Sequence, residues 1–452
     1  MEHLFFDHAL LPSGWAEDAC VEIADGTITA VAAGAPREGS HHIPGAAVPG
    51  FPNLHCHAFQ RGMAGRAEHG RSGGSDFWTW RQSMYRLVAA LTPEDVEAIA
   101  AFVYMEMLEA GFTSVAEFHY LHHGPDGTPY ADPSELAGRI VAAADETGIG
   151  LTLLPSFYAH GDFGGADPLP DQRRFVNDLD RFLAILQRSR ALVSVLPNAA
   201  LGIAPHSLRA VAPDELLALL AAVPDGPVHI HAAEQVKEVE RCAVWSGRRP
   251  VEWLMDQVSP DAHWCLIHAT HLTVDETAAL ARSGAVAGLC PVTEANLGDG
   301  TFPARDYLAM AGRLGVGSDS NIAVDPALEL RQLEYSQRLS HRARNVLTPA
   351  VGGSVGRPVF DSAIAGGAQA TGRPVGALAP GRRADIVVLD LEHPDLVARR
   401  GDDWLDGWIF AAGRPTVRNV FVGGRVLVTD GRHIRRDAIT ARYCTALRRL
   451  FS

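Results

Sequence analysis

The stretch AVPGFPNLHCH, residues 47–57, is an apolar run that ends in two histidines. A short apolar run of this kind, followed by polar residues, is typical of a strand buried in a parallel sheet. Seven further runs follow, separated by sequence with helical periodicity. The eight predicted strands are Ala47–Leu54, Thr113–Phe118, Gly150–Leu154, Ala200–Ala204, Val228–Ile230, Trp264–Ile267, Val286–Leu289 and Leu314–Gly317. This alternation indicates an α/β protein with a TIM-type (β/α)8 barrel over residues 49–370.

The clearest helix in this pattern is predicted over Thr92–Ala110. Thr92 suits the N-cap, Pro93 suits the first helical position, and the Asp95 side chain can close a capping box. Gly111 then favours the end of the helix, since glycine readily adopts the left-handed conformation found there.

The two ends of the chain have a different pattern. Asp25-Gly26 separates residues 20–23 from residues 27–31, and Gly423-Gly424 separates residues 420–422 from residues 425–428. Both arrangements predict β-hairpins, and residues 384–389 add another strand. Because the termini of compact chains often lie close together, we expect a small composite β domain of the sandwich type, built from residues 1–48 plus 371–452.

Composition and charge argue against several functional classes. The 452 residues hold 39 Lys and Arg against 53 Asp and Glu, a net charge of −14, which argues against nucleic acid or acidic membranes as partners. Neither an apolar run of about 18 residues nor a secretory signal is visible, so we expect no membrane span. Six scattered cysteines without a CxxC pair favour a reducing compartment, and we expect a cytoplasmic protein.

Polar residues follow four of the predicted strands. His55 and His57 end the first, His229 and His231 end the fifth, and His268 and Asp319 follow the sixth and eighth. Taken singly, His229 fits an ordinary buried histidine, and Asp319 fits a helix cap. Together, imidazoles and a carboxylate at the active face of a barrel suit one Zn²⁺ or Fe²⁺ ion.

The set His55-x-His57, His231-x-x-Glu234, His268 and Asp319 resembles the amidohydrolase superfamily, whose members have a distorted barrel and a small β domain from both termini. The resemblance implies that His55, His57, His231 and Asp319 hold the metal. Binuclear members use a bridging carboxylated lysine on the fourth strand, whereas the one lysine here, Lys237, follows Glu234. A single ion is therefore expected: zinc, with iron as the alternative.

Four stretches are similar to the formimidoylglutamate deiminase branch of that superfamily: PNLHCHAFQR at 52–61, FWTWR at 77–81, APHSLR at 204–209 and LEYSQRL at 333–339. One departure is Asn321, where the resemblance implies histidine. The implied reaction belongs to histidine degradation and converts N-formimino-L-glutamate into N-formyl-L-glutamate and ammonia. The resemblance gives catalytic roles to Glu234, His268 and Asp319.

The resemblance also implies substrate contacts for Gln60, Arg81, Tyr120, His206 and Arg209. A dicarboxylate substrate is physically consistent with the two arginines, because the planar guanidinium matches a carboxylate. Without the resemblance, both would more commonly be surface or ion-paired arginines. A homodimer is the family expectation.

Two other functions stay open from the sequence. One is another mononuclear deaminase of the same superfamily, acting on a guanine-like or adenosine-like ring. The other is a non-catalytic barrel that serves as a scaffold. The first needs a pocket for a heterocycle, and the second predicts lost metal ligands.

Overall fold

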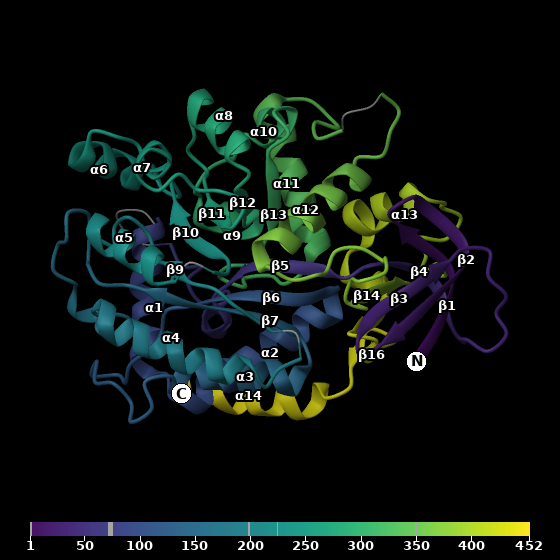
Figure 1. The fold of residues 1–452 in the computed structure, drawn as a ribbon, viewed down its shortest axis with the longest axis horizontal. Helices are drawn as coiled ribbons and strands as arrows, with labels where there is room; N and C mark the ends of the chain where they lie inside the picture. Colours follow the sequence, from purple (N-terminus) through teal and green to yellow (C-terminus); the bar gives the residue numbers. More distant parts are fainter. Residues whose placement is uncertain (1, 71–75, 198, 224, 349–350) are drawn as a thin grey trace.

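The chain folds into an α/β body and an adjoining sheet (Figure 1). This computed structural model describes residues 2–70, 76–197, 199–223, 225–348 and 351–452. The purple N-terminal and yellow C-terminal strands lie together in the adjoining sheet, and the middle of the chain forms the body. Within the described residues, no helix is long and apolar enough to cross a membrane.

The adjoining sheet contains eight strands in the order β17-β16-β15-β14-β4-β1-β2-β3. Their bounds are β1 Glu2–Leu11, β2 Gly14–Ala24, β3 Thr27–Ala32, β4 His41–Pro49, β14 Ile386–Leu389, β15 Val417–Val422, β16 Arg425–Thr429 and β17 Arg432–His433. Both predicted hairpins are confirmed as the antiparallel pairs β2–β3 and β15–β16. The antiparallel pair β4–β14 joins the two chain ends in one sheet, whereas a two-layered sandwich stays a prediction.

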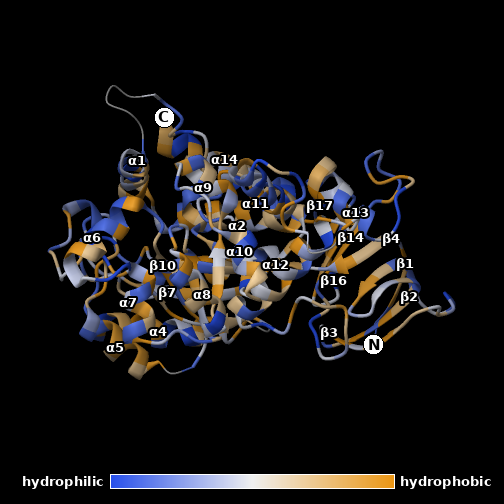
Figure 2. Ribbon diagram, turned by 90° about the horizontal axis from the view of Figure 1, so that it is seen from above, coloured by the Kyte–Doolittle hydropathy of each residue, from blue (hydrophilic) through white to orange (hydrophobic). Residues whose placement is uncertain are grey.

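This sheet has an apolar core of its own, separate from the core of the α/β body. Phe6, Val21, Ile28, Ile386 and Phe421 are buried there, and orange apolar segments mark these strands in Figure 2. Their burial explains why strands from distant parts of the sequence stay paired, because the apolar faces of β1, β2, β3, β14 and β15 leave water together.

The α/β body contains two parallel sheets. One holds β5 Phe51–Cys56, β6 Phe112–His119, β7 Gly150–Phe157, β8 Ala200–Leu201 and β9 Ala204–Pro205; the other holds β10 Val228–Ala232, β11 Trp264–His268, β12 Val286–Leu289 and β13 Arg313–Val316. Parallel bridges connect the sheets on both sides, between Cys56 and Asp319 and between Ser207 and His231. The strands therefore succeed one another in chain order, with polar residues at their carboxyl ends.

Most helices lie around these two sheets, whereas α13 lies beside the adjoining sheet, as Figure 1 shows. Their bounds are α1 Phe77–Ala90, α2 Pro93–Ala110, α3 Glu135–Thr147, α4 Leu179–Val193, α5 Pro213–Ala222, α6 Val236–Ser246, α7 Pro250–Gln257, α8 Val274–Ser283, α9 Pro291–Leu297, α10 Ala304–Ala309, α11 Pro326–His341, α12 Gly356–Thr371, α13 Asp402–Gly407 and α14 Arg436–Phe451. The predicted helix after Thr92 is confirmed, including its capping box and the left-handed Gly111. The last helix, α14, packs on α2, where the Phe102 and Tyr443 rings stack 3.8 Å apart.

Two predicted strands are wrong as continuous elements. Residues 47–54 belong to β4 and β5, because Gly50 N–H donates to the Asp385 carbonyl of the adjoining sheet, whereas Phe51 N–H donates to Gly111. Residues 200–204 form β8 and β9 with Gly202 between them, where a Cβ atom would collide with the Pro227 carbonyl. Both interruptions come from tertiary contacts rather than from local sequence.

The contact of α12 with β13 gives a test of the packing. A Cβ atom on Gly366 would collide with the Leu314 carbonyl, which belongs to backbone and has little room to move. We expect Gly366→Ala to lower the free energy of unfolding by about 1–3 kcal/mol through overpacking. Urea denaturation measures this change.

Gly138→Ala in α3 is the matched control. Its new methyl group would meet Leu192 Cδ1 at an ordinary 3.8 Å. Better helix propensity should raise stability there by up to about 1 kcal/mol. Equal effects of the two substitutions would contradict the close-packing argument.

Candidate active site

The predicted site residues converge at the carboxyl ends of β5, β10, β11 and β13. Asp319 N–H donates to the His55 carbonyl over 3.0 Å, and His57 N–H donates to the Asp319 carbonyl over 3.0 Å. Gly317 permits this approach, since a Cβ atom there would lie 2.7 Å from both His55 N and His55 O. The backbone itself therefore brings the first and last strands of the series together.

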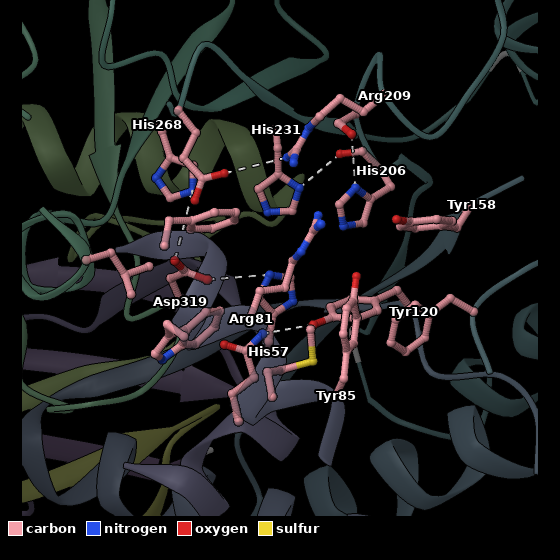
Figure 3. Close-up of a pocket in the computed structure, with 18 of the residues that line it drawn as sticks. His57, Arg81, Tyr85, Tyr120, Tyr158, His206, Arg209, His231, His268 and Asp319 are labelled. Atoms are coloured by element: carbon pink, nitrogen blue, oxygen red, sulfur yellow. Dashed lines mark hydrogen bonds and ion pairs between the residues drawn. The ribbon is translucent and has the colours of Figure 1, made fainter. Parts of the chain in front are cut away.

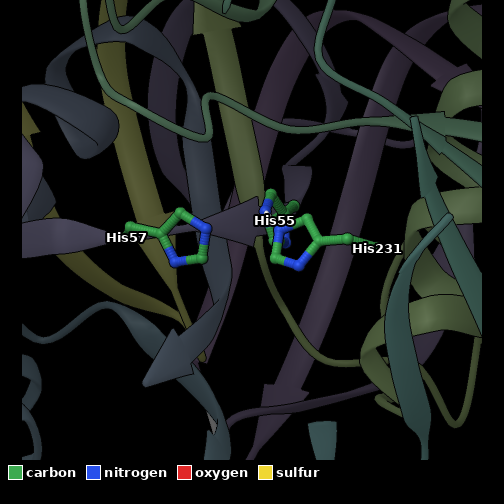
Figure 4. Close-up of side chains that lie close together, drawn as sticks. All are labelled: His55, His57 and His231. Carbon is green, nitrogen blue, oxygen red and sulfur yellow. Dashed lines mark hydrogen bonds between the residues drawn. The ribbon is translucent and has the colours of Figure 1, made fainter. Parts of the chain in front are cut away.

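Three imidazoles meet at this point (Figure 4). The Nε2 atoms of His55 and His231 are 3.2 Å apart, and Asp319 Oδ1 lies 3.4 Å from Nε2 of both His55 and His57. His57 Nδ1 donates to the Phe118 carbonyl, and His231 Nδ1 donates to the His206 carbonyl, each over 2.9 Å. Their Nε2 lone pairs are thus directed at the centre, so His55, His57 and His231 are placed to hold a metal ion.

Burial also sets the charge of these imidazoles. Loss of solvent lowers the pKa of His55, His57 and His231, and neighbouring imidazoles lower the pKa of His55 and His231 further. Neutral imidazole is the form that coordinates a cation. The donor set and its protonation state therefore fit a divalent metal.

His268 differs in charge from these three. Its Nδ1 lies 3.2 Å from Glu294 Oε1, and its Nε2 lies 3.8 Å from Glu234 Oε1 and 3.9 Å from Asp319 Oδ2. Burial opposes a charge on the ring, but the three carboxylates outweigh it and raise the pKa of His268 above its usual range. Burial likewise raises the pKa of Glu234 to about 7, although the charges of His268 and Arg209 oppose that rise.

A cavity opens beside the cluster (Figure 3). All eight residues predicted to act on or bind the substrate line this cavity: Gln60, Arg81, Tyr120, His206, Arg209, Glu234, His268 and Asp319. The predicted metal ligands His57 and His231 line it as well. His55 is fully buried behind this lining. His229 lies apart, since its Nε2 donates to the Ala370 carbonyl over 2.8 Å, as an ordinary buried histidine would.

The cavity holds polar atoms that lack partners. Gln60 Nε2 donates to Tyr120 Oη over 2.9 Å, whereas Gln60 Oε1 is buried with no hydrogen-bond partner in the described part of the chain. Arg209 Nη2 lies 3.7 Å from Glu234 Oε2. Burial opposes the charge of this arginine, but Glu238 and Glu234 raise its pKa above the usual value. Arg209 is therefore a fixed cation in the wall of the cavity.

Sequence reasoning missed several residues of this site. Tyr85 lies one turn after Arg81 on α1, and Tyr158 directly follows β7; both line the cavity. The helical spacing of Tyr85 from Arg81 could have identified Tyr85. Tyr158 could have been found because polar residues that follow barrel strands face the site. Glu294, beside His268, comes from α9, and no spacing in the sequence connects it with the metal cluster.

Asn321 occupies the position where histidine is expected. It is fully buried, and its Nδ2 donates to the carbonyls of His57 (3.1 Å) and Asp319 (2.9 Å). Its Oδ1 accepts a hydrogen bond from Ser318 Oγ over 2.7 Å. The Asn321 side chain therefore connects the two backbone segments that carry the predicted metal ligands His57 and Asp319.

Truncation of this amide tests its role. We expect Asn321→Ala to lower the free energy of unfolding by about 1–3 kcal/mol, since buried polar groups lose their partners. Metal retention after dialysis should fall by about 10–100-fold, because the ligands are less firmly held. Asn296→Ala is the control, as exposed Asn296 bonds only Glu68 among the described residues. Identical unfolding and metal content in both variants would count against this role.

Comparisons with known proteins agree with this geometry. Residues 46–427 match the amidohydrolase family model, and residues 1–41 match the N-terminal domain of formimidoylglutamate deiminase HutF. Formimidoylglutamate deiminase of Pseudomonas aeruginosa is 54% identical over 435 residues, covering 96% of each chain. A 5-methylthioadenosine/S-adenosylhomocysteine deaminase of Nitratidesulfovibrio vulgaris is 30% identical, covering 93% of this chain and 90% of its own.

A solved structure shares the whole fold. The crystal structure of an amidohydrolase from Brucella melitensis superposes with a TM-score of 0.96 at 52% identity, and each chain is covered completely. The agreement extends over both the adjoining sheet and the α/β body. The chain therefore belongs to the amidohydrolase family.

Proposed function

We propose that this protein is a formimidoylglutamate deiminase, a hydrolase that converts N-formimino-L-glutamate and water into N-formyl-L-glutamate and ammonia in histidine degradation. The observation that carries this function is the similarity to the Pseudomonas aeruginosa enzyme of that name over nearly the whole chain. The cavity supports it, because Arg81 and Arg209 line the same space as the histidine cluster.

The proposed metal site consists of His55, His57, His231 and Asp319, with one divalent ion. Zinc suits three imidazoles and a carboxylate, and iron suits them as well. Such an ion would supply Lewis acidity, which lowers the pKa of water to about 7. Three neutral imidazoles and the nearby Asp319 oxygen support this assignment.

Three residues are proposed to handle protons and charge. As water adds to the formimino carbon, Asp319 takes the proton that the water loses, and His268 lies beside it. The raised pKa of His268 favours its imidazolium form, which suits a second role, stabilising negative charge at the tetrahedral carbon. The departing nitrogen needs two protons to leave as ammonia rather than as an amide anion: Glu234 gives one, and Asp319 passes on the proton that it took from water. The hydroxyl group on the tetrahedral carbon then returns its proton to Glu234 as the carbonyl group forms.

Substrate orientation is assigned to the other predicted residues. Arg81 and Arg209 bind the two carboxylates, and the free Gln60 Oε1 accepts a hydrogen bond from an N–H group of the substrate. Tyr120 supports Gln60, and His206 contributes a further polar contact next to the Tyr158 ring, 4.7 Å away. Together these contacts place the formimino carbon at the metal centre.

The closed series of strands β5–β13 is proposed to be a distorted (β/α)8 barrel over residues 49–370. The proposed small domain comprises residues 1–48 plus 371–452. The bridges that link the two parallel sheets, and the separate core of the adjoining sheet, support both assignments. The homodimer and the cytoplasmic location stay predictions.

Ammonia release by the purified protein tests the function. We expect release from N-formimino-L-glutamate, loss of activity after treatment with a chelator, and recovery with added zinc or iron. Guanine and S-adenosylhomocysteine are the comparison substrates. Ammonia from a purine, and none from the formimino compound, would falsify the substrate assignment in favour of the other deaminase type. No metal binding and no turnover would support the scaffold.

Arg209→Met tests the carboxylate contact. A lost charge-assisted contact of about 2–3 kcal/mol lowers kcat/KM for N-formimino-L-glutamate by about 30–150-fold. Most of this loss should appear in KM, since the contact exists in the ground state as well. Arg248→Met removes a mostly exposed arginine that pairs with Asp256, and it serves as the control. An unchanged kcat/KM in folded Arg209→Met would reject this contact.

A further inference from the structure

Three cationic side chains meet around a single indole ring at the edge of the cavity. Trp78, at the start of α1, has Arg81 Cζ 4.6 Å, Lys237 Nζ 4.9 Å and Arg209 Cζ 5.9 Å from its ring centroid. These distances lie within the range of cation–π attraction. The three cations come from α1, from the segment after β9 and from the first turn of α6.

Most of this positive charge is not neutralised by protein. Arg209 has Glu234 at 3.7 Å and is also influenced by the charge of Glu238, but within the described ranges no carboxylate oxygen lies within 4.0 Å of Arg81 or Lys237. A protein of net charge −14 nevertheless gathers three cations here. Like charges at short range repel one another, and a bound anion would relieve that repulsion.

The Trp78 indole ring holds these cations without neutralising them. A π face attracts a cation without cancelling its charge, whereas a carboxylate would both neutralise it and occupy its N–H groups. Arg81 and Arg209 line the cavity, while Lys237 is exposed to solvent. The cations thus extend from solvent to the interior and keep donors available to an incoming anion.

We propose that Trp78 and Lys237 make the enzyme selective for substrates with two carboxylates. Trp78 is a positioning residue that holds Arg81 and Arg209, and Lys237 is a specificity-determining residue that attracts the second carboxylate. The inference rests on the proposed function for the identity of the substrate. It adds two residues that line neither the metal centre nor the cavity.

The experiment compares N-formimino-L-glutamate with N-formimino-L-glutamine, which has a single carboxylate. We expect Lys237→Gln to lower kcat/KM for the dicarboxylate by about three- to tenfold and to leave the value for the amide nearly unchanged. In Lys237→Gln, added salt should also lower kcat/KM for the dicarboxylate less than it does in the wild-type protein. Lys237→Arg should restore most of the preference, because it restores the charge.

A matched control separates this role from general charge effects. Arg241→Gln removes one positive charge from the same helix, but Arg241 pairs with Asp162 rather than with Trp78. It should leave the ratio of the two kcat/KM values unchanged. Trp78→Leu should raise KM for the dicarboxylate more than it lowers kcat, and Trp78→Phe should be milder because a π face remains.

Binding of simple acids gives a second readout. Calorimetry with glutarate and butyrate should show that Lys237→Gln weakens glutarate binding selectively. If Lys237→Gln and Arg241→Gln change both substrates and both acids equally, the selectivity proposal is wrong. If the wild-type protein releases ammonia from neither formimino compound, the proposed function fails, and the two acids still decide whether the cationic cluster prefers dicarboxylates.

Discussion

The parallel backbone bridge between Cys56 and Asp319 is the interaction on which the site depends. Two hydrogen bonds of 3.0 Å join the end of β5 to the segment after β13, although the two segments are more than 260 residues apart. Asn53 strengthens this junction, since its Nδ2 donates to Ser318 Oγ and its Oδ1 accepts from Ser318 N–H. Without this junction, the aspartate would be separated from the histidines, and the four donors would share no centre.

Burial around this junction determines what the side chains can do. A buried imidazole resists protonation, so His55, His57 and His231 remain neutral ligands, and backbone carbonyls fix which nitrogen of His57 and His231 faces inward. The backbone is strained at the same place, with φ of +66° at His268 and +42° at Asp319. Non-glycine residues in this conformation carry a cost that the surrounding structure must offset, and such positions cluster at functional sites.

Much of this arrangement was predictable because parallel strands end at one edge. The rule located His55, His57, His231, His268 and Asp319 from polar residues that follow apolar runs. The same rule does not decide which of two histidines on one strand reaches the metal cluster. His229 and His231 point to the same side, but they differ by about 6.6 Å in height, so one meets the cluster and the other meets a backbone carbonyl.

Other features had no local signal. The breaks at Gly50 and Gly202 depend on Asp385 and Pro227, whose positions follow from the folded structure alone. Glu294 reaches His268 from a helix that sequence spacing does not connect to it. A sequence pattern predicts which face of a strand is buried. It does not predict which helix residue lies opposite a strand end, because that depends on how the helices pack over the strands.

The electrostatics of substrate recognition follow from distance. A net charge of −14 opposes an anion in general, but at physiological salt, charges separated by more than about 8 Å are largely screened. The charged groups within that range decide recognition. At the cavity edge the cations Arg81, Arg209 and Lys237 surround one indole and outnumber the nearby Glu234 carboxylate, which lies 3.7 Å from Arg209. An acidic protein can therefore bind an acidic substrate, provided that its cations are held together by a group that leaves their charge intact.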